Sequence, residues 1–102
     1  MCSDFDVIAT RELEATREGI QGAHQVVVEI GKPVPDTASG GDWACEYRIS
    51  GLTKEHRMRV FGVDSIQAIQ NACIAIGGAL RGAHDPPRSA LTLNGEENLL
   101  FP

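Results

Sequence analysis

Residues 61–80 read FGVDSIQAIQNACIAIGGAL, and this stretch predicts the single helix on which the fold depends. Asp64 is a preferred N-cap residue, and Gln67 three positions later completes a capping-box pattern, so the helix is expected to begin at Asp64. Gly82 can end the helix. Asp85-Pro86-Pro87 then blocks any continuation, because proline lacks the backbone N–H that a helix needs.

The apolar positions of this helix recur every three or four residues. They are Ile66, Ile69, Cys73, Ile76 and Leu80. Residues spaced in this way lie on one side of a helix, so the pattern predicts a single apolar stripe that packs on a sheet.

Four other segments show the alternation of a strand, in which neighbouring side chains point to opposite faces. The expected strands are Val7–Arg17, His24–Gly31, Trp43–Ser50 and Arg57–Val63. The first is the least regular, since its alanines and glutamates also suit a helix. Prolines follow the second strand, which is therefore expected to stop there or to continue only as an unpaired edge.

The last two strands are close enough in the sequence to form an antiparallel hairpin. Its turn is expected near Thr53–Lys54, which places Ile49 opposite Met58. The same centre places Tyr47 opposite Val60, so that apolar residues face each other across the hairpin.

These elements predict an α+β fold, in which an antiparallel four-stranded meander carries one C-terminal helix packed on one face (ββββα). Residues 1–102 are expected to form a single domain, with residues 83–102 as a C-terminal extension that includes a possible short strand at Ala90–Leu93. The expected core face consists of Val26, Val28, Ile30, Cys45, Tyr47, Ile49, Met58 and Val60, with Trp43 closing one edge. The expected open face shows Val27, Glu29, Ala44, Glu46, Arg48, Arg59 and Phe61.

The composition excludes several classes of function. The chain has 102 residues, a formal net charge of −5 and a pI of about 5.0. Binding to nucleic acid depends on clustered Lys and Arg, so no nucleic-acid partner is expected. The sequence shows no secretory signal and no run approaching the roughly 20 apolar residues of a membrane span. Three widely spaced cysteines indicate reduced thiols, and we expect a soluble cytoplasmic protein.

No group of residues in the sequence has a catalytic or metal-binding pattern. The histidines are widely spaced, at His24, His56 and His84. No Cys/His cluster has zinc spacing, and nothing resembles a nucleophile beside a base. We therefore expect no enzyme activity, metal or cofactor; acid–base chemistry by Asp36, Asp42 or Glu46 is a weaker alternative.

The open face is the first candidate site, a contact surface made of Val27, Glu29, Glu46, Arg48, Arg59 and Phe61. In the expected hairpin register Arg48 faces Arg59, and like charges facing each other are unfavourable. Either Glu29 and Glu46 neutralise these arginines diagonally, or an external partner does. A small acidic protein can bury such a mixed face in a homodimer or against another protein.

The loop Pro33–Trp43 is the second candidate site. Asp36 and Asp42 bracket it beside Trp43, an arrangement that can bind a cation or a hydroxylated ligand. The alternative interpretation is a solvated loop, with Trp43 at the edge of the core.

Several of these motifs together resemble a known family. They follow the pattern IGKPxPD…GDWxCxYxIxGL…FGVDSxQAxQ. From about Gln25 to Leu80 the chain is similar to small bacterial proteins that carry a domain of unknown function. The resemblance implies a bacterial, single-domain protein and brings no catalytic residues with it.

Taken together, the sequence favours a non-enzymatic interaction or accessory module that can self-associate. One alternative is a small-ligand-binding domain that uses the Pro33–Trp43 loop. Another is an immunity- or antitoxin-like partner of a basic protein, because acidic surfaces attract basic ones.

Overall fold

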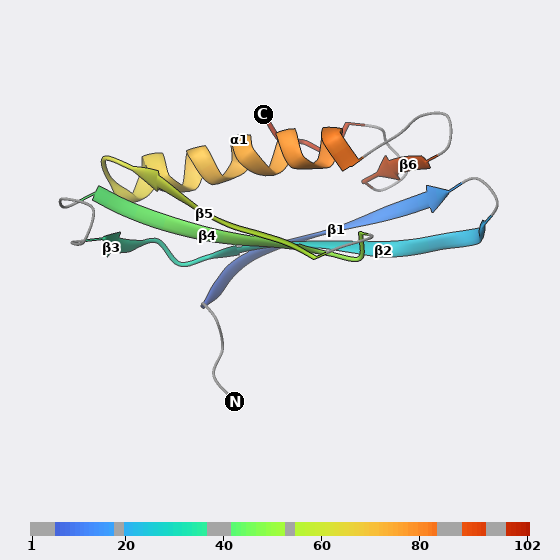
Figure 1. The fold of residues 1–102 in the computed structure, drawn as a ribbon, viewed down its shortest axis with the longest axis horizontal. Helices are drawn as coiled ribbons and strands as arrows, with labels where there is room; N and C mark the ends of the chain where they lie inside the picture. The colour runs from blue at the N-terminus through green and yellow to red at the C-terminus, as the bar shows by residue number, and fades with distance from the viewer. Residues whose placement is uncertain (1–5, 18–19, 37–41, 53–54, 84–88, 94–97) are drawn as a thin grey trace.

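The computed structural model describes residues 6–17, 20–36, 42–52, 55–83, 89–93 and 98–102. Within them an antiparallel sheet carries one helix that runs lengthwise along one face (Figure 1). The elements are β1 (Val7–Arg17), β2 (Ile20–Gly31), β3 (Val34–Asp36), β4 (Asp42–Ser50), β5 (His56–Gly62), α1 (Ser65–Ala83) and β6 (Ser89–Thr92). The α+β class is confirmed, but the sheet has six strands rather than four.

β1, β2, β4 and β5 form the expected meander, and β3 is an unexpected addition to it. β4 pairs with β5 along one edge. Its other edge pairs with β2 at one end and with β3 at the other end. β2 ends at Gly31 as expected, but the chain then returns to the ladder, with Val34 opposite Ala44. Of the two expected outcomes the strand stops at the prolines, and the separate strand β3 can pair because a proline removes only its own N–H.

β6 is the second addition. It pairs antiparallel with β1, from Glu14 opposite Thr92 to Arg17 opposite Ser89. Leu91 on this strand is buried in the core. The possible strand at the C-terminal end is therefore confirmed, and it extends the sheet beyond β1.

The β4–β5 register differs from the expected one by two residues. Tyr47 lies opposite Met58, and Ile49 lies opposite His56. A two-residue shift leaves every side chain on its face, so the alternation of the sequence does not distinguish the two registers. Gly51 helps to select the observed one, because its φ of 99° bends the chain directly after β4.

The N-cap of α1 at Asp64 is confirmed, but the Gln67 side chain accepts from Val63 and not from the cap residue itself. The Gln67 N–H donates to Asp64 Oδ1 at 2.7 Å, and the Val63 N–H donates to Gln67 Oε1 at 2.7 Å. The expected apolar stripe was wrong at its first member, because Ile66 is 65% exposed. The fully buried positions are Ala68, Ala72, Ile76 and Leu80.

Relative to the predicted stripe, the helix is rotated about its axis so that Ile66 faces solvent. The position of Gly62 explains this rotation. A side chain at Gly62 would collide with the Ala68 backbone nitrogen, so strand and helix approach each other closely here. Asn71 Nδ2 also donates to the Phe61 carbonyl oxygen at 2.7 Å. These contacts turn the small residues Ala68 and Ala72 toward the sheet.

The core lies between the helix and the inner face of the sheet. The expected members Val26, Val28, Ile30, Cys45, Tyr47 and Ile49 are all buried. Val60 and Trp43 pack against them while partly exposed. Met58 was expected in the core but is 46% exposed, because the described residues pair β5 on one side only and so leave it at an edge of the sheet.

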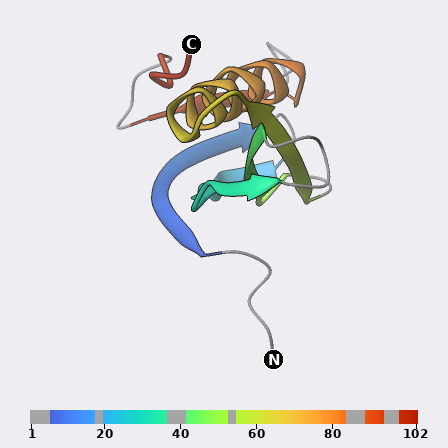
Figure 2. The same ribbon diagram turned by 90° about the vertical axis from the view of Figure 1, so that its left-hand side faces the viewer.

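Residues 98–102 lie between β1 and α1. Arg11 Nη1 donates to the carbonyl oxygens of Leu99 and Leu100 at 2.9 and 3.1 Å. Arg81 Nη1 on the helix donates to the Pro102 carbonyl oxygen at 3.2 Å. Figure 2 shows this segment beside the helix, with β1 curving up toward it.

Gly62→Ala tests the close approach of strand and helix. The added methyl group should lower the free energy of unfolding by about 2 kcal/mol, because the backbone of α1 must move away. Urea denaturation measures this change. Gly78→Ala is the matched control: its methyl group meets open space, and it should raise helix stability by about 0.5–1 kcal/mol. Equal stability of the wild type and Gly62→Ala would contradict the packing.

The Cys45 thiol provides a test of the core at high pH. Burial raises the pKa of this thiol from 9.0 to about 11, with smaller contributions from Cys73 and Glu46. Folding therefore favours the protonated thiol, and this stabilisation is lost as the pH rises from 9.0 to about 11. The difference in unfolding free energy between the wild type and Cys45→Ala should fall by about 2 kcal/mol over that range. A difference that does not change with pH would contradict the burial of this thiol.

Candidate functional site

The open face of the sheet carries a network of ion pairs. Arg48 Nη2 lies 2.8 Å from Glu29 Oε1. Arg57 donates to Glu46 Oε2 through Nε and Nη2, at 3.0 and 2.9 Å. Arg59 Nη1 lies 3.8 Å from Glu46 Oε1. The face expected to be a contact surface is thus extensively paired within the chain.

The predicted opposition of Arg48 and Arg59 was wrong, since the two-residue register shift places Arg57 opposite Arg48. Like charges still face each other, and each of these arginines is held by a carboxylate. Of the two alternatives set out from the sequence, neutralisation by Glu29 and Glu46 is the one observed. The charges of this face therefore require no external partner.

Ala44 was expected on the open face but is 1% exposed. Val34 lies opposite it on β3, and Phe61 lies opposite it on β5. These two larger side chains shield the small methyl group from both sides. Phe61 itself is 43% exposed, and Val27 is partly buried.

The predicted ligand loop falls partly outside the described residues, which omit 37–41. Asp36 ends β3 directly opposite Asp42, so the structure does bring these two carboxylates to neighbouring positions. Asp36 lies 3.7 Å from Arg59 Nη2, while Asp42 is exposed. Trp43 packs against the core, as the alternative interpretation of this loop expected.

Two histidines have partners in the fold, and His84 lies outside the described residues. His24 Nε2 is 3.1 Å from the Gly51 carbonyl oxygen. His56 Nε2 is 2.9 Å from the Tyr47 hydroxyl, and burial raises the pKa of that phenol. In the described part of the chain, no group of three or more His, Cys, Asp and Glu side chains could hold a metal ion.

The structure reveals a different exposed surface along β5. Four large apolar side chains lie within nine residues of sequence, each at least 43% exposed: Met58, Phe61, Val63 and Ile66. We call this set the β5 edge surface, because the described residues pair β5 with β4 alone. Phe61 was named in the sequence analysis, whereas the other three were assigned to the core or passed over.

A signal for this surface was present in the sequence. Val63 and Ile66 lie on either side of the cap residue Asp64, at the turn from strand to helix. Both precede Ala68, the first helix residue that is fully buried. Large apolar residues at such a turn have little core within reach. Their number near an edge strand indicates an interaction surface.

Comparison with known proteins gives a family but no function. A family model described as "Domain of unknown function (DUF6968)" matches residues 9–102. The match includes the first strand and the C-terminal segment, which lay outside the resemblance noted from the sequence. No curated protein and no solved structure matches the chain. Within the described residues, no helix combines the length and hydropathy required to cross a bilayer.

Glu46→Gln tests the ion-pair network of the open face. The substitution should lower the free energy of unfolding by up to about 1 kcal/mol at low salt, because Arg57 and Arg59 lose a shared carboxylate. Salt at about 1 M should remove most of this difference by screening. Urea denaturation at both salt concentrations measures it. If the free energy of unfolding falls by the same amount at both salt concentrations, Glu46 acts through packing and not through its charge.

Proposed function

We propose that this chain, which belongs to the family of domains of unknown function DUF6968, is a non-enzymatic interaction module that self-associates through the β5 edge surface. The observation that carries this proposal is the clustering of exposed apolar side chains at an edge strand. The acidic chain and its free Cys45 and Cys73 thiols are consistent with the cytoplasmic location expected from the sequence.

The backbone of β5 supports this proposal. An edge strand presents N–H and C=O groups that a further strand can pair with. Side chains project from both faces beside that edge, with Met58 on the helix side and Phe61 on the open side. A second β5 laid alongside would cover apolar area on both faces of a continuous sheet.

The residues of β5 disfavour two registers for such a pairing. In an antiparallel pair with a two-fold axis at Met58, Arg57 faces Arg59 of the second copy. With the axis at Arg59, that residue faces its own copy. Both registers oppose like charges, which is unfavourable. With the axis at Val60, Arg59 faces Phe61 of the second copy, and no like charges oppose each other.

The Val60-centred register repeats a contact already present within the chain. The Arg59 guanidinium carbon lies 6.0 Å from the centre of the Phe61 ring. An arginine near an aromatic face is attracted to it. Arg59 can therefore contact Phe61 favourably both within its own chain and across the interface. This two-fold axis is perpendicular to the sheet and leaves both helices on the same side.

Light scattering of the purified chain tests the proposal. The wild type should approach a mass of twice 10.9 kDa as the protein concentration rises. Phe61→Lys should remain a monomer, because in the Val60-centred register the lysine faces Arg59 of the second copy, and like charges oppose each other. Ile8→Lys on β1 is the matched control, since Ile8 is also exposed, at 53%, and this variant should dimerise like the wild type.

Two results would contradict the proposal. One is a wild type that keeps the mass of a monomer at every concentration. The other is a Phe61→Lys variant that dimerises as well as the wild type. Circular dichroism of each variant shows that the fold is retained.

A further inference from the structure

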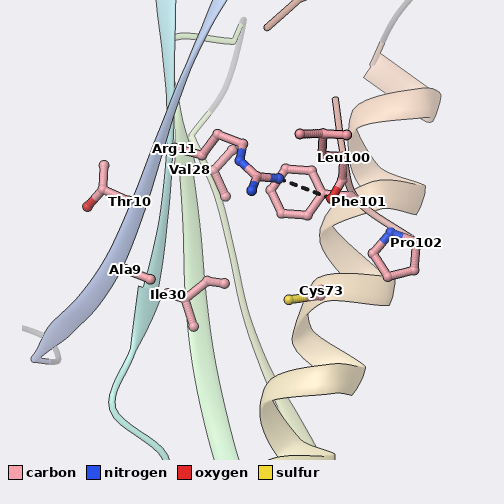
Figure 3. Close-up of a pocket in the computed structure, with 9 residues that line it drawn as sticks. All are labelled: Ala9, Thr10, Arg11, Val28, Ile30, Cys73, Leu100, Phe101 and Pro102. Carbon is pink, nitrogen blue, oxygen red and sulfur yellow. Dashed lines mark hydrogen bonds between the residues drawn. The ribbon is translucent and has the colours of Figure 1, made fainter. Parts of the chain in front are cut away.

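A pocket lies between the sheet and the helix, away from β5. Its volume is about 150 Å³. Val28 and Ile30 form the wall on the sheet, Cys73 the wall on α1, and Phe101 and Pro102 the wall on the C-terminal segment, as Figure 3 shows. These side chains give the pocket an apolar interior.

Arg11 is the charged residue of this pocket. Its guanidinium carbon lies 4.6 Å from the centre of the Phe101 ring, and its Nη1 bonds two main-chain carbonyl oxygens. An arginine carries N–H donors on Nε and Nη2 as well. Neither of these atoms has a partner among the described residues, so Arg11 can still bind an acceptor.

The charge of Arg11 also lacks a counterion in the described part of the chain. Arg48, Arg57 and Arg59 all lie within ion-pair distance of carboxylates. The contacts of Arg11 with described residues, by contrast, are with carbonyl oxygens and a ring, and no Asp or Glu side chain lines the pocket. A partly buried cation without a counterion favours an anion beside it.

We propose that this pocket binds a small organic monocarboxylate with a compact apolar body. The carboxylate accepts hydrogen bonds from Nε and Nη2 of Arg11. The apolar body lies against Val28, Ile30 and Cys73. A cavity of this volume holds a molecule of about the size of benzene, so benzoate is a suitable probe.

Amide chemical shifts of the ¹⁵N-labelled chain, titrated with sodium benzoate, test the proposal. The signals of Ala9, Arg11 and Cys73 should shift and saturate in the millimolar range. Benzamide has the same shape without the charge and should bind about tenfold more weakly, because it loses a charge-assisted hydrogen bond. No saturable shift with benzoate, equal binding of the two probes, or shifts centred elsewhere would each overturn the proposal.

Variants separate the charge from the apolar wall. Arg11→Met should abolish the preference for benzoate over benzamide. Cys73→Leu should weaken both probes by filling the pocket while Arg11 is kept. Arg48→Met removes an arginine that is ion-paired outside the pocket and should leave benzoate binding unchanged. Equal preference for benzoate in Arg11→Met and the wild type would overturn the role of Arg11, and the amide spectrum of each variant reports its fold.

Discussion

The backbone contact between Gly62 and the first turns of α1 determines how the rest of the structure is arranged. Because Gly62 has no side chain, the end of β5 approaches Ala68 closely, and the Asp64 cap begins the helix directly after it. This junction fixes the rotation of the helix about its own axis. Ala72 and Ile76 then face the sheet, while Ile66 remains exposed beside the edge of β5.

Two separate regions follow from this arrangement. At one side of the sheet, β5 has an edge that no other described strand pairs with, and it carries exposed apolar residues, although the adjacent charges are neutralised by Glu29 and Glu46. Beyond the opposite edge of the core, β1 and α1 leave a gap that the C-terminal segment partly fills, and Arg11 holds that segment. The interaction surface and the pocket therefore use different residues, and one can be altered without the other.

Local patterns in the sequence predicted the helix cap, the meander and the core face, since each depends on residues close together in the chain. What they did not predict arises from contacts between distant residues. The phase of the helix depends on Gly62 meeting Ala68, and the hairpin register depends on the turn at Gly51. The pairing of β6 with β1 and the hydrogen bonds of Arg11 link the two ends of the chain. The periodicity of the sequence does not predict such long-range contacts. For the candidate surface, the alternation of β5 predicted that Phe61 is exposed. The exposure of Ile66 was missed because it depends on the phase of the helix.

The rotation of α1 is the central claim, and nuclear Overhauser effects between methyl-bearing side chains measure it most directly. The account predicts contacts from the methyl groups of Ala72 and Ile76 to the buried side chains of β4, Tyr47 and Ile49. It predicts none from Ile66, which is 65% exposed. Contacts from Ile66 to Tyr47 or Ile49, with Ala72 in solvent, would contradict the helix phase and the surface derived from it.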